Sequence, residues 1–219
     1  MASFKHDLFN QFARVGKALS NGNRLELLEF LAQGERSVEE LSNISEMTIG
    51  NTSQHLKQLR QAGLVSSRKD GLKVYYNLTG NDVISLLDDM RVVAQRHITD
   101  VQHLVDTYLT VKDDLEPIPR EELLQRVKDD LVSVLDVRPA EEFAAGHVPG
   151  AINVPLNELE SYLDKLGTEQ EIVAYCRGPH CVLAFDAVAK AREKGLKARR
   201  LEDGFPEWKT AGLPIEHQV

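Results

Sequence analysis

The segment from Thr110 to Pro119 constrains the fold of this 219-residue chain more than any other feature. It holds charged residues and two prolines and has no amphipathic period. Because proline lacks an amide donor and disfavours a helical residue before it, a helix that enters from the N-terminal side should end here. No internal repeat or low-complexity stretch appears on either side. We therefore expect two domains, residues 1–112 and 113–219, with the boundary near 111–118.

Charge also separates the two halves. Residues 1–112 hold 13 Lys and Arg against 13 Asp and Glu, whereas residues 113–219 hold 13 against 21, so the net charge of −8 lies in the second half. Such an asymmetry is typical of two domains with different partners. No run approaches the ~20 apolar residues of a membrane span. The N-terminus lacks the apolar region of a signal peptide, so we expect a cytoplasmic protein.

Helical patterns fill the start of the chain. Apolar residues at helical spacing predict a helix that ends near Leu19 and a second, shorter helix that ends near Gly34. Ser37 and Glu40 have the spacing of a capping box, in which each side chain accepts a hydrogen bond from the backbone amide of the other residue. A third helix should begin there.

A β-hairpin is expected after the next helix. The pattern predicts a helix over residues 48–62, and two β-prone runs then flank the Asp-Gly pair at 70–71, a strong turn signal. A last long helix is expected over residues 82–109, with Asn81 as its N-cap. Two helices joined by a turn and followed by a hairpin have the order of a winged helix-turn-helix. The first half is thus predicted to be a mainly α winged helix-turn-helix domain.

The second helix of this motif and the hairpin carry side chains suited to DNA. Polar groups in the helix have the chemistry to reach base edges in a major groove, and the basic residues give residues 48–76 a local charge of +4. The alternative is that these residues form solvated faces of a helical domain, but their placement on the helix and hairpin favours DNA. The expected contacts are Asn51, Thr52, Ser53, Gln54, His55, Lys57, Arg60, Arg68, Lys69 and Lys73.

Residues 37–78, SVEELSNISEMTIGNTSQHLKQLRQAGLVSSRKDGLKVYYNL, resemble the core of ArsR/SmtB-type bacterial repressors, and the resemblance extends over about residues 5–108. It implies a homodimer, built on the first and last helices, that presents two recognition helices to a palindromic operator in double-stranded DNA. An apolar stripe on the last helix, too long for one small domain to bury, agrees with this expectation. The stripe consists of Val83, Leu87, Met90, Ala94, Ile98, Val101, Leu104 and Tyr108.

The chain departs from that family in its sensor residues. Many such repressors sense metals through cysteine thiolates before the recognition helix, or through carboxylate and His ligands on the last helix. The first half has no cysteine, and the i, i+3, i+6 spacing of His97, Asp100 and His103 does not place all three on one helix face. We expect no metal site and no cofactor.

The second half alternates strands and helices. Apolar runs predict strands over 132–136, 172–175 and 198–201, and helical spacing predicts a helix over 183–194. Strands separated by helices indicate an α/β domain with a mostly parallel sheet.

The two cysteines of the chain, Cys176 and Cys181, flank one short loop between a strand and a helix. Ligands of open α/β sheets gather at the carboxyl ends of strands, and a loop that enters a helix N-terminus directs backbone amides at anions. A thiolate of Cys176 should therefore have a lowered pKa, with help from Arg177, and act as a nucleophile. The alternative is an inert core thiol. Its position at the edge of the strand favours the nucleophile.

The second half resembles a rhodanese domain over about residues 120–215. The resemblance rests on Val134–Arg138, Gly146–Pro155, the VAYCRGPHC stretch and Asp203–Trp208. It implies that Cys176 accepts sulfane sulfur as a persulfide and passes it to a nucleophilic acceptor. The amides of the active-site loop, which comprises Arg177, Gly178, Pro179, His180 and Cys181, would hold the outer sulfur. Asp136, Arg138 and His147 match signature positions that would hold the scaffold through a buried ion pair and turn hydrogen bonds.

Related folds support phosphatases and arsenate reductases, but these need an Arg six positions after the nucleophile, where this chain has Val182. Cys181 could be a resolving thiol that forms a disulfide or polysulfide with Cys176, or a small residue that begins the helix. Sequence spacing does not decide between them, because a disulfide depends on the distance and direction of the two Cβ atoms. His180 could tune either thiol or simply be exposed.

Three functions are compatible with this domain combination. We favour a DNA-binding transcriptional regulator that senses reactive sulfur through its rhodanese domain. The alternative is a sulfurtransferase that moves sulfur from a sulfane donor to a thiol acceptor, with the winged helix for dimerisation or localisation. A third is a repressor with an inert rhodanese-like domain.

Overall fold

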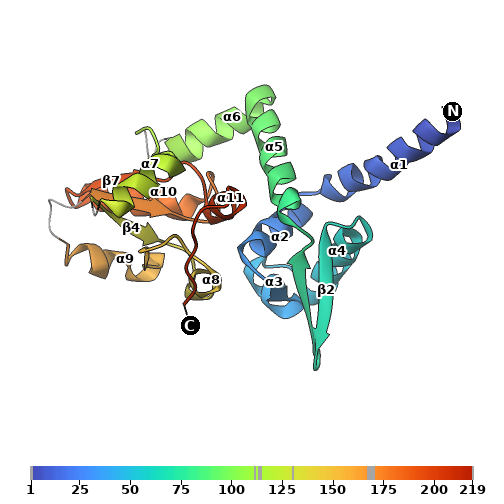
Figure 1. The fold of residues 1–219 in the computed structure, drawn as a ribbon, viewed down its shortest axis with the longest axis horizontal. Helices are drawn as coiled ribbons and strands as arrows, with labels where there is room; N and C mark the ends of the chain where they lie inside the picture. Colours follow the sequence, from blue (N-terminus) through green and yellow to red (C-terminus); the bar gives the residue numbers. More distant parts are fainter. Residues whose placement is uncertain (1, 111, 113–114, 130, 167–170, 219) are drawn as a thin grey trace. The chain divides into compact units, whose positions relative to one another are not determined.

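The computed structural model describes the chain except residues 1, 111, 113–114, 130, 167–170 and 219 (Figure 1). It divides into two compact units, Met1–Leu87 and Asp88–Val219. The expected domain boundary near 111–118 lies partly outside the described residues. Within the described part of the chain, no helix is both long and apolar enough to cross a bilayer.

The first unit is a winged helix-turn-helix fold. Helix α5 (Asn81–His97) follows the second hairpin strand. The antiparallel sheet has the order β1-β3-β2, with the register Val65 to Leu78 and Asp70 to Lys73 in the hairpin. The elements are α1 (Ala2–Leu19), α2 (Gly22–Gln33), β1 (Arg36–Ser37), α3 (Val38–Ile44), α4 (Ile49–Gln61), β2 (Val65–Asp70) and β3 (Lys73–Leu78).

Local sequence explains where these helices begin. The side chain of Asn21 accepts a hydrogen bond from the amide of Arg24 at the start of α2, and Thr48 does the same for Asn51 at the start of α4. The capping box predicted for Ser37 and Glu40 is confirmed at the start of α3. Leucines of α2, α3 and α4 then form the core, with no exposed surface at Leu27, Leu28, Leu41, Leu56 and Leu59.

The prediction of one long helix over residues 82–109 is wrong. The structure has α5 (Asn81–His97), α6 (Thr99–Val105) and the π-helix η1 (Asp106–Thr110). Ile98 separates the first two with an extended backbone, φ −110° and ψ 107°. Two consecutive β-branched residues, Ile98 and Thr99, have low helix propensity, which favours a break at this point.

The second unit is an α/β fold with four parallel strands in the order β5-β4-β6-β7, which confirms the predicted parallel sheet. Apolar residues of α9 and α10 pack on one face of the sheet, and those of α7 and α11 pack on the other. The elements of this α/β part are α7 (Arg120–Lys128), β4 (Val132–Asp136), α8 (Ala140–Ala145), β5 (Ile152–Asn153), α9 (Leu156–Leu163), β6 (Glu171–Tyr175), α10 (Val182–Glu193), β7 (Lys197–Arg200) and α11 (Phe205–Thr210).

Candidate functional site

Cys176 directly follows β6, at the carboxyl end of the parallel sheet. Its side chain is 1% exposed and packs in the apolar cluster with residues of α9 and α10. The loop then leads into α10, for which Cys181 is the N-cap residue. The N-terminal amides and the positive end of the α10 dipole therefore face the loop, an arrangement that favours a thiolate.

Cys176 and Cys181 form a disulfide bond in the structure, with their Cα atoms 6.1 Å apart. The backbone between them is tight, since the amide of Cys181 donates to the carbonyl of Gly178 at 3.1 Å. Cys181 is half-buried, as are Gly178, Pro179 and His180, whereas Cys176 is almost fully buried. The pairing that the sequence left open is thus present, and Cys181 is the more exposed residue of the pair.

Gly204 supports the other side of the loop. A Cβ atom at this position would lie 2.5 Å from the carbonyl carbon of Arg177 and still closer to the backbone of Gly178. The next amide, that of Phe205, donates to the carbonyl of Cys176 at 3.0 Å. The backbone of the loop thus packs directly on the start of α11, with no room for a side chain between them.

Arg177 is held by a carboxylate. Its guanidinium binds both oxygens of Glu142 at 2.7–3.1 Å, and Glu142 is 1% exposed. The positive charge that the sequence suggested for lowering the thiol pKa is therefore balanced by a buried negative charge. This leaves the loop amides and the α10 dipole as the groups that favour a Cys176 thiolate.

Asp136 and Arg138 form a completely buried ion pair beneath the loop. The guanidinium binds both carboxylate oxygens and also donates to the carbonyl of Gly146 at 2.8 Å. The hydroxyl of Tyr175 donates to Asp136 at 2.5 Å and accepts from the amide of Val148. Burial, followed by the negative charge of Asp136, raises the pKa of Tyr175 well above its usual value, so this hydroxyl stays protonated.

His147 belongs to the same scaffold, where it contacts Phe143 and Glu216. Its Nδ1 is 2.9 Å from the carbonyl oxygen of Phe143, and its ring stacks on that of Phe143 with the centroids 3.7 Å apart. Its Nε2 lies 3.8 Å from a carboxylate oxygen of Glu216. These contacts fix the turn after α8.

Two residues at the loop were missed by sequence reasoning. Glu207 of α11 is 6% exposed, accepts from the amide of Gly204 at 3.0 Å and binds Arg91 of α5 at 3.0 Å. A Cβ on Gly178 would lie 3.5 Å from the Arg91 guanidinium and 3.9 Å from Glu207. Burial raises the pKa of Glu207, and the charge of Arg91 opposes that rise. Because these partners are 116 residues apart, no local pattern indicates the pair.

A cavity of about 310 Å³ lies beside the helix-proximal end of the loop. His180 and Val182, which flank Cys181, form one wall, and mostly apolar residues of α5, α6 and η1 form the other. Burial, followed by the charges of Arg91 and Arg200, lowers the pKa of His180. The imidazole is therefore neutral at physiological pH and adds no positive charge at the thiols.

In the first unit, most of the expected DNA contacts are exposed on α4 and the hairpin. Asn51, Ser53 and Gln54 project into solvent near the start of α4, followed by Lys57 and Arg60. Arg60 also donates to the hydroxyl of Ser67 on β2 at 3.0 Å.

Thr52 is a correction to the sequence prediction. Its side chain is fully buried, and its hydroxyl donates to the carbonyl of Thr48 at 3.0 Å, so it cannot reach a base edge. Helical period explains this, because Thr52 shares a face with the core residues Leu56 and Leu59. His55 is half-buried, and burial followed by the charge of Arg24 lowers its pKa.

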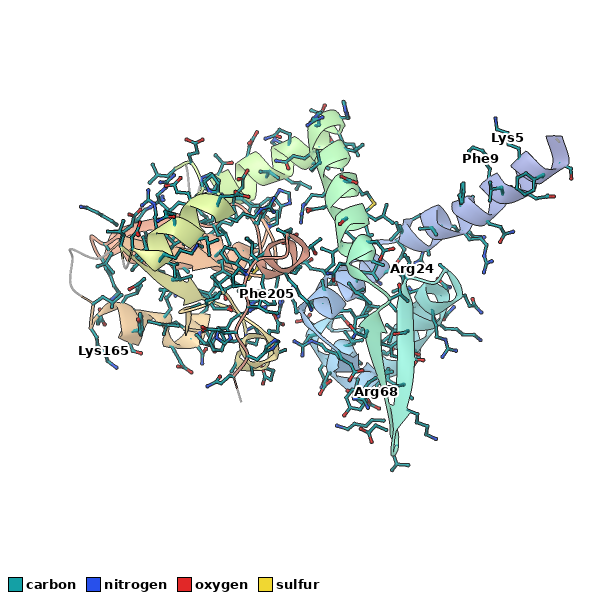
Figure 2. All side chains as sticks on the ribbon, viewed as in Figure 1. Lys5, Phe9, Arg24, Arg68, Lys165 and Phe205 are labelled. Carbon is teal, nitrogen blue, oxygen red and sulfur yellow. A yellow bond between two sulfur atoms is a disulfide. The ribbon has the colours of Figure 1, made fainter. Side chains whose placement is uncertain are left out.

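The basic residues of the hairpin differ in whether they are free to bind phosphate. Arg68 lies on the hairpin (Figure 2). It binds Glu35 through two nitrogens at 2.5–3.0 Å and Asp70 at 3.1 Å, and it stacks 4.6 Å from the ring of Tyr75. Lys69 and Lys73 are exposed, with no ion pair to any carboxylate in the described part of the chain. The two lysines are therefore better placed than Arg68 to bind phosphate.

Two family profiles match separate parts of the chain. The profile of the arsR family of bacterial regulatory proteins matches residues 21–67, and that of the rhodanese-like domain matches residues 119–211. The HTH-type transcriptional regulator Rv0324 of Mycobacterium tuberculosis is 46% identical over 212 residues, which are 97% of this chain and 93% of that protein.

Solved structures resemble each part separately. The homodimeric winged helix-turn-helix DNA-binding domain of Mb0332 from Mycobacterium bovis is 45% identical, covers 43% of this chain and 87% of that one, and has a TM-score of 0.41. A rhodanese-related protein from Thermoplasma volcanium is 26% identical, covers 47% of this chain and 98% of that one, and has a TM-score of 0.42. On the near full-length relative and the two profiles, the chain belongs to the arsR family of bacterial regulatory proteins and carries a C-terminal rhodanese-like domain.

Proposed function

We propose that this transcriptional regulator binds operator DNA through its winged helix and that the sulfur chemistry of Cys176 and Cys181 sets its affinity. The observation that carries the proposal is the disulfide between these two residues at the end of β6. The family membership supports the DNA-binding part. The first unit has no cysteine, so any thiol-based signal has to arise in the rhodanese-like domain.

The sensing chemistry needs only a persulfide donor and the two thiols. The Cys176 thiolate attacks the outer sulfur of a persulfide R–S–SH, forms Cys176–S–SH and releases the thiolate RS⁻. The Cys181 thiolate then attacks Sγ of Cys176, forms the disulfide and releases HS⁻. The outer sulfur is reduced to sulfide while the two thiols are oxidised. An external thiol restores the reduced state by attack on the disulfide, and Cys181 is the more exposed of its two residues.

A change in the bonding of the two cysteines should alter how the loop packs on its surroundings. Its backbone is packed against Gly204 and bonded to the amide of Phe205, so it cannot adjust to a new bond without affecting the start of α11. Two packed arrangements that differ in sulfur state need a coupling of only about 1–3 kcal/mol to change operator affinity 5- to 150-fold.

A homodimer in the cytoplasm is part of the proposal. α1 exposes Phe4, Phe9 and Phe12 at 57–72% of their surface, and the rings of Phe9 and Phe12 meet edge to face. Figure 2 shows Phe9 on this helix. α6 and η1 expose Leu104 and Tyr108. Apolar helix faces of this extent are typical of a protein interface, and a two-fold dimer would present two copies of α4 to a palindrome.

The test compares operator affinity of the full chain in three states: reduced, treated with a low-molecular-weight persulfide, and treated and then reduced again. We expect treatment to change the affinity 5- to 150-fold and reduction to restore it. Cys176→Ser should abolish the response. Cys181→Ser should stop at the persulfide, visible by intact mass as one added sulfur atom. Equal affinities in all states, with the disulfide verified by mass, would refute the sulfur-sensing proposal and leave the DNA-binding part intact.

A sulfurtransferase is the second candidate, favoured by the position of Cys176 in a rhodanese-like domain. Disulfide formation by Cys181 removes the nucleophile after each reaction, so wild type should show one fast turnover and then depend on added thiol. Cys181→Ser should sustain turnover with thiosulfate and cyanide. Sustained turnover by wild type without added thiol would favour the enzyme over the sensor.

A further inference from the structure

A cationic cavity of about 700 Å³ lies in the first unit, between the end of α1, the start of α2 and the second half of α4. Its charged residues are Arg14, Lys17 and Arg24, and its neutral polar residues include Ser20, Gln58 and Gln61. Every ionisable group named in its lining is basic. Such a lining is complementary to an anion.

Arg24 is the most unusual of these residues because its charge is buried. The residue is only 9% exposed, and its guanidinium donates to the carbonyls of Ala18 and Lys17 and to the side-chain oxygen of Gln58. All three acceptors are neutral, and no described carboxylate lies within ion-pair distance of Arg24. A buried guanidinium without a counter-charge is unfavourable, and an anion in the cavity would offset that cost.

The neighbouring groups add to the positive potential. Arg14 is exposed and donates to the neutral oxygens of Gln61 and Gln11 at 2.8 and 2.9 Å. Lys17 is exposed, and within the part of the chain that the structure describes it forms no ion pair. The first turn of α2 has no acidic residue, so the positive end of its dipole is uncompensated there.

We propose that this cavity binds a phosphate group of the DNA backbone. The inference rests on the DNA-binding function proposed above. DNA is the favoured source of the phosphate because α4, which carries Lys57 and Arg60, also supplies Gln58 and Gln61 to the cavity. α1 thus contributes to DNA affinity, at a site outside the hairpin and the start of α4. A phosphate contact of this kind fixes the register of the protein on the duplex and carries no sequence information.

The test measures DNA binding by the full chain as a function of salt. The probes are a duplex selected by wild type from a random library and an unrelated duplex of the same length. Lys17→Gln and Arg14→Gln remove exposed charges from the cavity, and Lys5→Gln is the matched control, since Lys5 is exposed on the same helix and lies 5.8 Å from the ring of Phe9 (Figure 2). The two cavity variants should lower the affinity for both duplexes by the same factor. They should also lower the slope of log affinity against log salt by about 0.9 for each phosphate that is no longer bound. Lys5→Gln should keep the wild-type slope.

Two further measurements identify other occupants. If inorganic phosphate raises the melting temperature of wild type, but not that of Arg14→Gln/Lys17→Gln, while the DNA slopes stay equal, free phosphate is the ligand and the DNA assignment is overturned. If the double variant instead dissociates into monomers while the slope of log DNA affinity against log salt stays unchanged, the cavity binds a carboxylate of a second copy of the chain. That result would also overturn the DNA assignment. If wild type binds no duplex, the proposed function fails with it. If wild type binds and Lys17→Gln behaves as Lys5→Gln, only the cavity assignment fails.

Discussion

Single atoms around Cys176 decide what the loop can do. Gly204 is needed for its lack of a side chain, because the loop backbone occupies the space that a Cβ would take. Glu142 holds Arg177, the residue next to Cys176, through a mostly buried ion pair. The chemistry of the site therefore depends on contacts made by residues that carry no sulfur.

Gly204→Ala should displace the loop. The added methyl group overlaps the backbone of Arg177 and Gly178, and overpacking of this kind costs about 1–3 kcal/mol. We expect a lower free energy of unfolding of the second unit and slower reaction of Cys176 with persulfide. Gly16→Ala, where a Cβ meets open space in a helix, is the control and should not destabilise. Unchanged persulfide kinetics in Gly204→Ala would show that the close approach is unimportant.

His180 should make the stability of the second unit sensitive to acid. Its pKa is lowered in the folded chain by burial and by the charges of Arg91 and Arg200, so the unfolded chain binds the proton more tightly. The stability that neutral His180 contributes is present above the unfolded pKa of about 6.5 and is lost as pH falls through the folded pKa. In urea unfolding between about pH 7 and 5, the free energy of unfolding should therefore fall less for His180→Gln than for wild type. His103→Gln, at an exposed residue of α6, should follow the wild-type curve.

Sequence reasoning at this scale predicted the position of Cys176 between a strand and a helix, but not the residues that support the loop. Cys176 was predictable because a strand, a short loop and a helix follow one another in the sequence. Glu142 binds Arg177 over a separation of 35 residues and Glu207 binds Arg91 over 116. Such pairs depend on how strands and helices assemble, which no local spacing encodes.

At the scale of elements, α4 illustrates that consecutive polar residues on a helix do not all face solvent. Asn51, Ser53 and Gln54 face solvent, whereas Thr52 between them faces the core. The burial of Thr52 was predictable from the helical period, because Thr52 lies four residues before Leu56 and seven before Leu59, on the same face of α4.

Substitutions in α4 should separate base reading from folding. Asn51→Ala and Gln54→Ala should reduce discrimination between the selected duplex and its base-pair variants by about 1–3 kcal/mol for each bidentate hydrogen-bonded pair removed. Thr52→Ser keeps the hydroxyl that donates to Thr48 and should leave discrimination unchanged. Competition binding with single-base-pair variants of the duplex measures this. Loss of discrimination in Thr52→Ser at unchanged stability would contradict the buried placement.

The long and strongly patterned elements were predictable to within about two residues, as α4, β4, β6 and α10 illustrate. The two-residue strands β1 and β5 were not, because a strand that short has no period to detect. The break at Ile98 was also missed, since the apolar stripe continues across it and the pattern alone does not register one extended residue.

At the scale of the whole molecule, the exposed face of α1 predicts the oligomeric state. Phe9→Asp/Phe12→Asp places two charges on that face and should convert a dimer into a monomer in sedimentation experiments. Operator affinity should fall as well, because a monomer reads a single half-site. Leu131→Asp is the control for both measurements, since Leu131 is 61% exposed and lies between α7 and β4, away from the hairpin and α1 in the sequence. A double variant that stays dimeric would assign the interface to another surface.

The proposed sensing requires a path from the loop toward the DNA-binding fold, and α5 is a continuous helix that begins in the first unit and ends in the second. Arg91 lies on that helix and binds Glu207. Glu207 in turn accepts a hydrogen bond from the amide of Gly204, which packs on the loop backbone. A change of sulfur state that moves the loop should therefore act on Arg91.

Arg91→Gln should uncouple DNA affinity from sulfur state while leaving the cysteine chemistry intact. We expect normal formation of the disulfide by intact mass but a smaller ratio between the operator affinities of the reduced and oxidised chains. Glu207→Gln should have the same effect without leaving an unpaired buried charge, and the double variant should add little to either, as expected for one interacting pair. Arg96→Gln, at an exposed residue of the same helix, should keep the full ratio. A full response in Arg91→Gln would place the coupling in other contacts, since a path is established only where both sites bias the same element.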